Sequence, residues 1–267
     1  LEPRLTLVLS DAYQSAHYSA RLNELAERFP ELEFECIFAE HDDIIGPINA
    51  EVAAAKAKAL EIWHTPEYLA ALQQAETTGV ATDEMKARYG LGTHANPIYP
   101  EVWRRPATAA GASLLAGELL KDGGTIYHPG GGTHHGMPDR ANGFCYLNDP
   151  VLAILSLRRN GAQRIAYIDI DAHHMDGVEH AFADDPDMLL ISTHEEKRWP
   201  FTGALDDAGI GQTYNLPLAR NLNDTEMAHI LDHLILPLID QMAPDALVLQ
   251  CGADAVEEDP LSRLTLS

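Results

Sequence analysis

The chain has 267 residues, of which 46% are hydrophobic, so it can bury a sizeable core and is not disordered throughout. Its 41 acidic residues against 18 lysines and arginines give a formal net charge of -23, and such a surface repels nucleic acid and attracts cationic partners. Three scattered cysteines, no apolar run of membrane-spanning length and no export signal predict a cytoplasmic protein that binds neither nucleic acid nor membranes. The first residue is Leu1 rather than methionine, so we expect the natural start to be missing.

Apolar, β-branched segments alternate along the chain with segments of helical periodicity. Strands are expected at Leu5–Leu9, Phe34–Phe38, Thr125–His128, Arg164–Ile170, Met188–Ser192 and Ala246–Cys251. Helices are expected at Ser15–Phe29, Glu51–Trp63, Pro66–Ala75, Arg104–Lys121, Pro150–Asn160 and Thr225–Met242. This alternation predicts one α/β domain over 1–267, with a mostly parallel sheet covered by helices on both faces. Functional residues should then gather at the carboxyl ends of the strands.

The segment Ile168–Gly177 carries the densest set of chemically active side chains, because an apolar strand runs directly into acids and histidines. Residues two apart in an extended backbone point to the same side, so Asp171 and His173 can face one metal ion together. Charged groups beside a buried strand are costly unless a metal or hydrogen bonds hold them. A solvated loop at the strand end explains this pair equally well on its own.

A second apolar strand, within Leu247–Asp254, also ends in an acid. Taken alone, Asp254 is more often a helix or turn cap than a ligand. Together with Asp171 and His173 it supplies a third ligand. Three protein ligands leave a position open for water and substrate, as a catalytic zinc requires.

The glycine-rich segment His128–Gly136 follows another predicted strand, but no Gly-Lys-Ser/Thr follows it, so we reject nucleotide binding. Its adjacent histidines, His134 and His135, indicate acid–base chemistry. Each then needs a carboxylate to fix its tautomer, and the candidates are Asp169 and Asp176. The alternative is a polar loop that the two histidines merely line.

Two further histidines, His229 and His233, lie four residues apart on a predicted helix, as metal ligands sometimes do. The metalloprotease pattern needs glutamate where this chain has Ile230. We therefore interpret them as part of a solvated helix face.

Three blocks together resemble the zinc-dependent histone deacetylase superfamily, most closely its bacterial acetoin-utilisation-like members. The blocks are His128–Asp149, Ile168–Gly177 and Gln250–Pro260, and the similarity extends from about His64 to the end. The resemblance implies an arginase/deacetylase-like fold. It also implies a zinc-dependent amidohydrolase that removes an acetyl or other acyl group from lysine or from a small acylated amine.

The same resemblance assigns roles to individual residues. One zinc ion per chain is expected on Asp171, His173 and Asp254. His135 is expected to act as general base and acid with support from Asp176, and His134, backed by Asp169, as its electrostatic partner. A narrow acyl-lysine tunnel is expected between Gly143 and Phe144 on one side and Trp199 on the other, with Leu261 at the rim. A structural potassium ion is expected on Asp169, Asp171, His173 and Ser192.

Four departures from the family pattern stand out. Met175 replaces the usual glycine, and Ala95 replaces an aspartate that grips the substrate backbone, which favours a small or loosely held amide. The stretch before His64 matches poorly. The family's glycine-rich loop and catalytic tyrosine would lie beyond Ser267, so we expect the C-terminal part of the fold to be missing and the strand leading to Asp254 to have an open edge.

Alternative functions remain at this stage. Arginase-like enzymes share the fold but bind two manganese ions through additional acids, at positions where this chain has Met175 and Val256. An inactive relative that binds acyl-lysine without cleaving it is a second alternative. An acetylpolyamine amidohydrolase is a third, although polyamine-selective relatives are acidic at the position of Leu261. The physiological substrate, the acyl length and the oligomeric state are not predicted.

Overall fold

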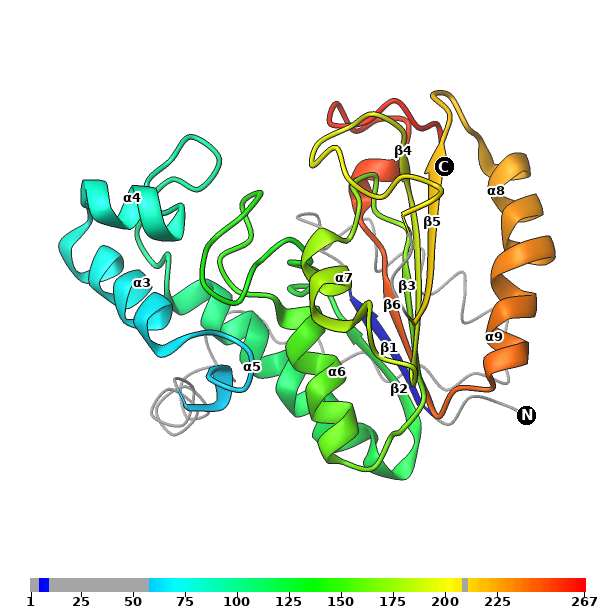
Figure 1. Ribbon diagram of the computed structural model, residues 1–267, viewed down its shortest axis with the longest axis horizontal. Coiled ribbons are helices and arrows are strands. Elements are labelled where there is room, and N and C mark those ends of the chain that lie inside the picture. The colour runs from blue at the N-terminus through cyan, green and yellow to red at the C-terminus, as the bar shows by residue number, and fades with distance from the viewer. Residues whose placement is uncertain (1–4, 10–57, 208–210) are drawn as a thin grey trace.

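The computed structural model describes residues 5–9, 58–207 and 211–267, and Figure 1 shows their arrangement. Two of the predicted elements, Ser15–Phe29 and Phe34–Phe38, lie outside the described residues. The first part of the predicted helix Glu51–Trp63 also lies outside them.

Six strands form one sheet in the spatial order β2-β1-β6-β3-β4-β5, and the described pairings are all parallel. The strands are β1 (Leu5–Leu9), β2 (Gly124–His128), β3 (Ile165–Asp169), β4 (Met188–Glu195), β5 (Gln212–Leu218) and β6 (Ala246–Gln250). Because the strands are parallel, their carboxyl ends share one edge of the sheet.

Helices cover both faces of this sheet. The described α-helices are α3 (Pro66–Thr78), α4 (Asp83–Tyr89), α5 (Arg104–Leu119), α6 (Asp149–Arg159), α7 (Asp176–Phe182), α8 (Asp224–Ile230) and α9 (Leu236–Met242), of which α3 and α4 lie beyond α5, away from the sheet. In Figure 1 the sheet is seen nearly edge-on, with α5 and α6 on one side and α8 and α9 on the other.

The central strand β3 is buried along its whole length because it lies between the two helical layers. Ile165 and Tyr167 pack in one hydrophobic cluster with residues of α6, whereas Ala166 and Ile168 pack in another with residues of α9. A strand covered on both faces is expected to be apolar, and β3 is so from Ile165 to Ile168, before it ends in Asp169. The predicted fold class, a mostly parallel sheet with helices on both faces, is confirmed.

The structure adds two α-helices and one strand that the sequence did not predict, α4, α7 and β5. Helices of seven residues, such as α4 and α7, are too short for a clear periodic signal. β5 contains Pro217 and lies at the edge of the sheet, where a missing amide is tolerated. The predicted helix Thr225–Met242 is divided by a π-helical segment, Leu231–Ile235, just before Pro237.

β6 is paired on both sides, with β3 along one edge and β1 along the other. The expectation of an open edge beside the strand leading to Asp254 is therefore wrong for the described sheet, because β1 occupies that position.

Candidate metal centre

The centre forms where β3 and β6 end side by side, with Asp169 in register with Gln250. Beyond Asp169 the chain leaves the strand and turns. The Asp171 amide donates to Asp169 Oδ1 at 3.0 Å, and the His173 amide donates to Asp171 Oδ1 at 2.7 Å. Asp171 and His173 thus converge through a hydrogen-bonded turn. The alternation argument predicted their proximity, but the extended conformation on which it depended is wrong.

Asp254 reaches the same place from a short 3-10 turn, Ala253–Ala255, that follows β6. Its Oδ1 accepts a hydrogen bond from the Ala172 amide at 2.9 Å. Gly252 allows this close approach, because a Cβ atom built there would lie 2.0 Å from Asp171 Oδ2. The two ligand-bearing loops therefore fit together only with glycine at this position.

One ligand atom from each of Asp171, His173 and Asp254 lies within 4.8 Å of the others. His173 Nδ1 is 2.7 Å from Asp254 Oδ2 and 3.1 Å from Asp171 Oδ1. In a tetrahedral zinc site with bonds of about 2.0–2.1 Å, donor atoms lie roughly 3.3 Å apart. His173 Nδ1 needs to move only slightly away from both carboxylates to accommodate the ion, so the donor set fits one zinc, and three protein ligands would leave a fourth position for water or substrate.

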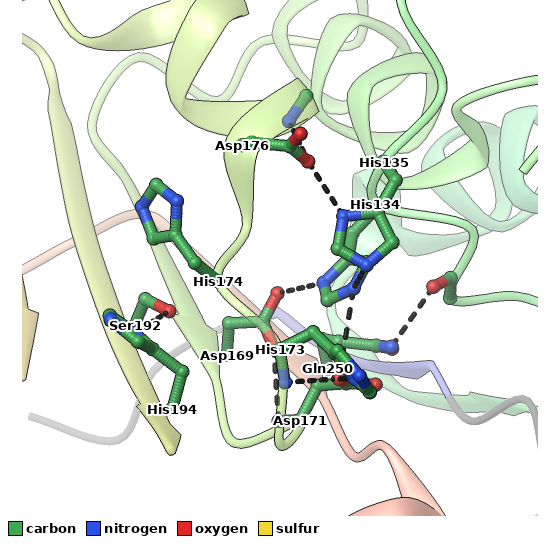
Figure 2. Close-up of polar contacts among 12 residues, drawn as sticks. His134, His135, Asp169, Asp171, His173, His174, Asp176, Ser192, His194 and Gln250 are labelled. Carbon is green, nitrogen blue, oxygen red and sulfur yellow. Dashed lines mark hydrogen bonds and ion pairs between the residues drawn. The ribbon is translucent and has the colours of Figure 1, made fainter. Parts of the chain in front are cut away.

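Two histidine–aspartate pairs lie beside these ligands (Figure 2). His134 Nδ1 is 2.7 Å from Asp169 Oδ2, and His135 Nδ1 is 2.6 Å from Asp176 Oδ1. The ring centroids of His135 and His173 are 6.0 Å apart. The structure thus brings together the acids and histidines that the sequence paired, while their catalytic roles stay predictions.

The pKa values of the two histidines move in opposite directions. Burial lowers the pKa of His134, but the carboxylates of Asp169 and Asp171 outweigh burial and raise it to about 10. Burial and the charge of His134 lower the pKa of His135 against the opposing effect of Asp176. At neutral pH the His134 ring is therefore protonated on both nitrogens and positively charged. The His135 ring is neutral, so its Nε2 atom is an acceptor. Separated pKa values of this kind suit acid–base chemistry.

Two buried side chains that the sequence analysis did not single out fix the histidine loop. Asn148 Nδ2 donates to the carbonyls of His134 and Gly136 at 3.0 and 2.9 Å. Asp149 Oδ1 accepts hydrogen bonds from the amides at positions 132 and 133, at 2.9 and 2.8 Å. The sequence Asn148-Asp149-Pro150 is typical of a helix start, and Asn148 Oδ1 does cap α6 at Val151. The helix-start sequence does not indicate that Asn148 and Asp149 also hold the histidine loop.

The residues expected to form the tunnel lie in two environments. Gly143 has a φ of +53°, and a Cβ atom built on it would lie 2.2 Å from Cη2 of Trp199. The Trp199 ring also lies 4.7 Å from that of His135. Phe144 and Leu261 are 67% and 59% exposed. Gly143 and Trp199 therefore contact each other beside the histidines, and the roles of all four residues stay predictions.

Met175 is fully buried in the core, so its side chain cannot bind a second metal ion. Its φ of -71° is ordinary, and the loop that follows still places Asp176 beside His135. Ser192 Oγ contacts His194 Nδ1 at 3.0 Å, and the potassium site stays a prediction. The rings of His229 and His233, 4.0 Å apart, lie on the α8 segment and the π-helical segment after it.

A three-ligand centre with two histidine–aspartate pairs, at the carboxyl edge of a parallel sheet, is an arrangement suited to metal-dependent hydrolysis. The histone deacetylase domain matches residues 16–267, and the chain belongs to the histone deacetylase family. The resemblance predicted from the three sequence blocks is confirmed.

Two curated relatives illustrate this kinship. The chain is 34% identical over 214 residues to the acetoin utilization protein AcuC of Bacillus subtilis, a match that covers 77% of this chain and 55% of that protein. It is 36% identical over 214 residues to histone deacetylase 8 of Xenopus laevis, covering 77% and 65%. The chain thus spans between about half and two thirds of the length of these relatives.

Solved structures agree with the sequence comparisons. A histone deacetylase homologue in complex with SAHA superposes with a TM-score of 0.75 at 30% identity, covering 99% of this chain and 72% of that one. A homologue from Aquifex aeolicus gives a TM-score of 0.75 at 29% identity, covering 98% and 72%. Within the described residues, no helix is both long enough and apolar enough to cross a membrane.

Proposed function

We propose that this chain forms the zinc site of a deacetylase that hydrolyses the N-acetyl, or another N-acyl, amide of lysine or of a small amine. The observation that carries the proposal is the set Asp171, His173 and Asp254, with His173 Nδ1 2.7 and 3.1 Å from the two carboxylates. Zinc bound there supplies a Lewis acid that polarises the amide carbonyl and makes water more acidic.

His135 moves the proton in this reaction. Asp176 holds its Nδ1, so its Nε2 takes a proton from the attacking water and returns it to the leaving nitrogen. The water oxygen bonds to the carbonyl carbon, the amide C–N bond breaks, and the products are a carboxylic acid and a free amine. His134 is held at its Nδ1 by Asp169, and this carboxylate favours the protonated ring, which contributes positive charge.

Trp199 and Gly143 form the wall beside the reacting amide, with Phe144 and Leu261 at the exposed rim. With Ala95 in place of an acid, the site has little grip on a peptide backbone, so simple acyl-lysine amides and longer peptides should be cleaved similarly. The net charge of -23 attracts cationic substrates, and added salt weakens that attraction.

Three measurements test the proposal. Elemental analysis should give one zinc per chain, and zinc-loaded protein should bind the hydroxamate SAHA, which tests the site independently of turnover. The full-length gene product should convert acetyl-lysine to lysine and acetate, detected by mass spectrometry. Two manganese ions per chain, with no hydroxamate binding, would instead favour the dinuclear arginase-like reaction.

A further inference from the structure

Glu195 is a buried carboxylate outside the proposed metal centre. It ends β4 and is 2% exposed. Its backbone amide donates to the carbonyl of Ala172, between the two candidate ligands of that loop, at 3.0 Å. A buried acid is costly unless it is paired, and the partners of Glu195 come from two different loops.

Arg198 connects those two loops. Its Nε and Nη2 lie 2.7 and 2.6 Å from Glu195 Oε2, and its Nη1 donates to the carbonyl of Leu261. The same Oε2 accepts a hydrogen bond from the Arg263 amide at 2.8 Å. Burial raises the pKa of Glu195, but Arg198 and the Arg263 amide outweigh burial and hold it below its usual value. One charged pair thus joins the segment before Trp199 to the segment that carries Leu261.

The segment after Glu195 has a backbone that needs such support. Lys197 and Phe201 have φ values of +58° and +65°, in a left-handed region that bulky residues rarely adopt. The Phe201 side chain is 75% exposed, so packing of its ring does little to offset that strain. The Phe201 amide donates to the Arg198 carbonyl at 2.8 Å and closes a turn around Trp199. Arg198 is therefore both the start of this turn and its link to Glu195.

We propose that Glu195 and Arg198 are positioning residues that hold Trp199 beside the metal centre and join its loop to the segment that carries Leu261, and so set how tightly the centre holds an acylated ligand. The second half of this statement rests on the proposed function. The Trp199 ring lies 4.7 Å from that of His135 and 6.2 Å from that of His173, so a displaced loop changes the space next to both imidazoles. Glu195 acts only through the residues that it holds.

The position of Trp199 can be measured without metal or substrate. The chain has three tryptophans, so labelling with 5-fluorotryptophan gives three ¹⁹F resonances, and Trp199→Phe assigns one of them. Glu195→Gln and Arg198→Met should each shift or broaden the Trp199 resonance and leave those of Trp63 and Trp103 in place. Arg198→Lys keeps the charge, but one ammonium cannot replace the three-point contact, so it should produce a smaller change and provides a milder variant if the others fold poorly.

Arg220→Met is the matched control. Its Nε lies 3.4 Å from Glu195 Oε1, but its side chain is 67% exposed, and its described ion pair reaches neither Trp199 nor Leu261. It removes the same type of side chain from the same carboxylate and should leave all three resonances unchanged. A Trp199 resonance that stays in place in both Glu195→Gln and Arg198→Met overturns the proposal.

Hydroxamate binding tests the consequence for the site. Zinc-loaded Glu195→Gln and Arg198→Met should keep their zinc but bind SAHA about tenfold more weakly, the size expected when an apolar contact in a pocket is lost. If the wild type binds SAHA and the variants bind it equally well, the claim that the pair controls ligand binding is wrong. If the wild type takes up neither zinc nor SAHA, the proposed function fails, while the ¹⁹F comparison still decides whether the pair positions Trp199.

Discussion

The Nε2 atoms of His134 and His135 lie 3.0 Å apart, while each ring is held at its Nδ1 by a different carboxylate. Because the pKa of His134 is raised and that of His135 is lowered, only one of the two rings is available as a base at neutral pH. The two neighbouring imidazoles are therefore not interchangeable.

His135→Ala should lower deacetylation by about 10²–10⁴-fold, the usual contribution of a general acid–base group. Its zinc content should not change, because His135 is not among the three ligands. The measurement is turnover of acetyl-lysine by the full-length gene product together with metal analysis. His229→Ala, on α8, is the control and should match the wild type. Near-normal turnover of His135→Ala would contradict the assigned role.

Asp254→Ala should abolish stoichiometric zinc binding, because two remaining ligands hold the ion poorly. Elemental analysis after dialysis against a weak chelator provides the measurement. Glu258→Ala removes an exposed acid from the same loop and should retain one zinc per chain. Equal zinc in both variants would show that Asp254 serves as a turn cap and not as a ligand.

Gly252→Ala should also lose zinc, although it removes no ligand. The new Cβ atom would lie 2.0 Å from Asp171 Oδ2 and must displace that carboxylate or the backbone of the turn. Gly79→Ala is the control, because its φ of +72° gives strain of about 1 kcal/mol but no atom lies within 4 Å of the new Cβ. Gly79→Ala should be slightly less stable and bind zinc normally. Full zinc binding by Gly252→Ala would contradict the close approach of the two loops.

Acid should destabilise the protein partly through His64. This buried imidazole contacts the Met137 carbonyl at 3.1 Å and accepts the Asn148 amide at 3.0 Å. Burial lowers its pKa from 6.5 to about 4. The unfolded chain therefore binds the extra proton first, and the stability from neutral His64 is present above pH 6.5 and is lost as the pH falls toward 4. The loss is on the order of 3 kcal/mol.

Urea unfolding of the wild type and of His64→Gln at pH 7 and pH 4 measures this contribution. The wild type should lose more free energy of unfolding than the variant over this interval, even though the variant starts from a lower value at pH 7. Parallel losses in the two proteins would mean that His64 does not contribute to the acid sensitivity.

The sequence predicted the centre better than its surroundings, for a physical reason. Asp171 and Asp254 follow strands whose apolar composition is visible in the sequence, and parallel strands bring their ends to one edge. Asn142 could not be found in this way. Its Nδ2 donates to Asp176 Oδ2 at 2.9 Å across a separation of 34 residues, which no local pattern records. Glu195 is a second case, since its bond to the Arg263 amide joins residues 68 apart.

Because local patterns do not record long-range contacts, the prediction of the fold also contains errors. β5 was not predicted, and it tolerates Pro217 because the strand lies at the edge of the sheet. The periodicity of Thr225–Met242 indicated one helix, because apolar spacing does not reveal a π-helical segment within it. Which strand is at an edge, and where a helix changes its hydrogen bonding, depend on tertiary contacts.

The hydrogen bond between the Ala172 amide and Asp254 joins residues 82 apart in the chain, and it forms only when β6 lies beside β3. During synthesis, a ribosome-bound chain would expose Asp171 and His173 well before Asp254 emerges. The nascent chain then offers zinc two ligands instead of three. If zinc binds as proposed, its tight capture must wait until β6 has docked, and the ion would then stabilise the completed sheet by mass action. Metal loading would thus report that the centre of the molecule has finished folding.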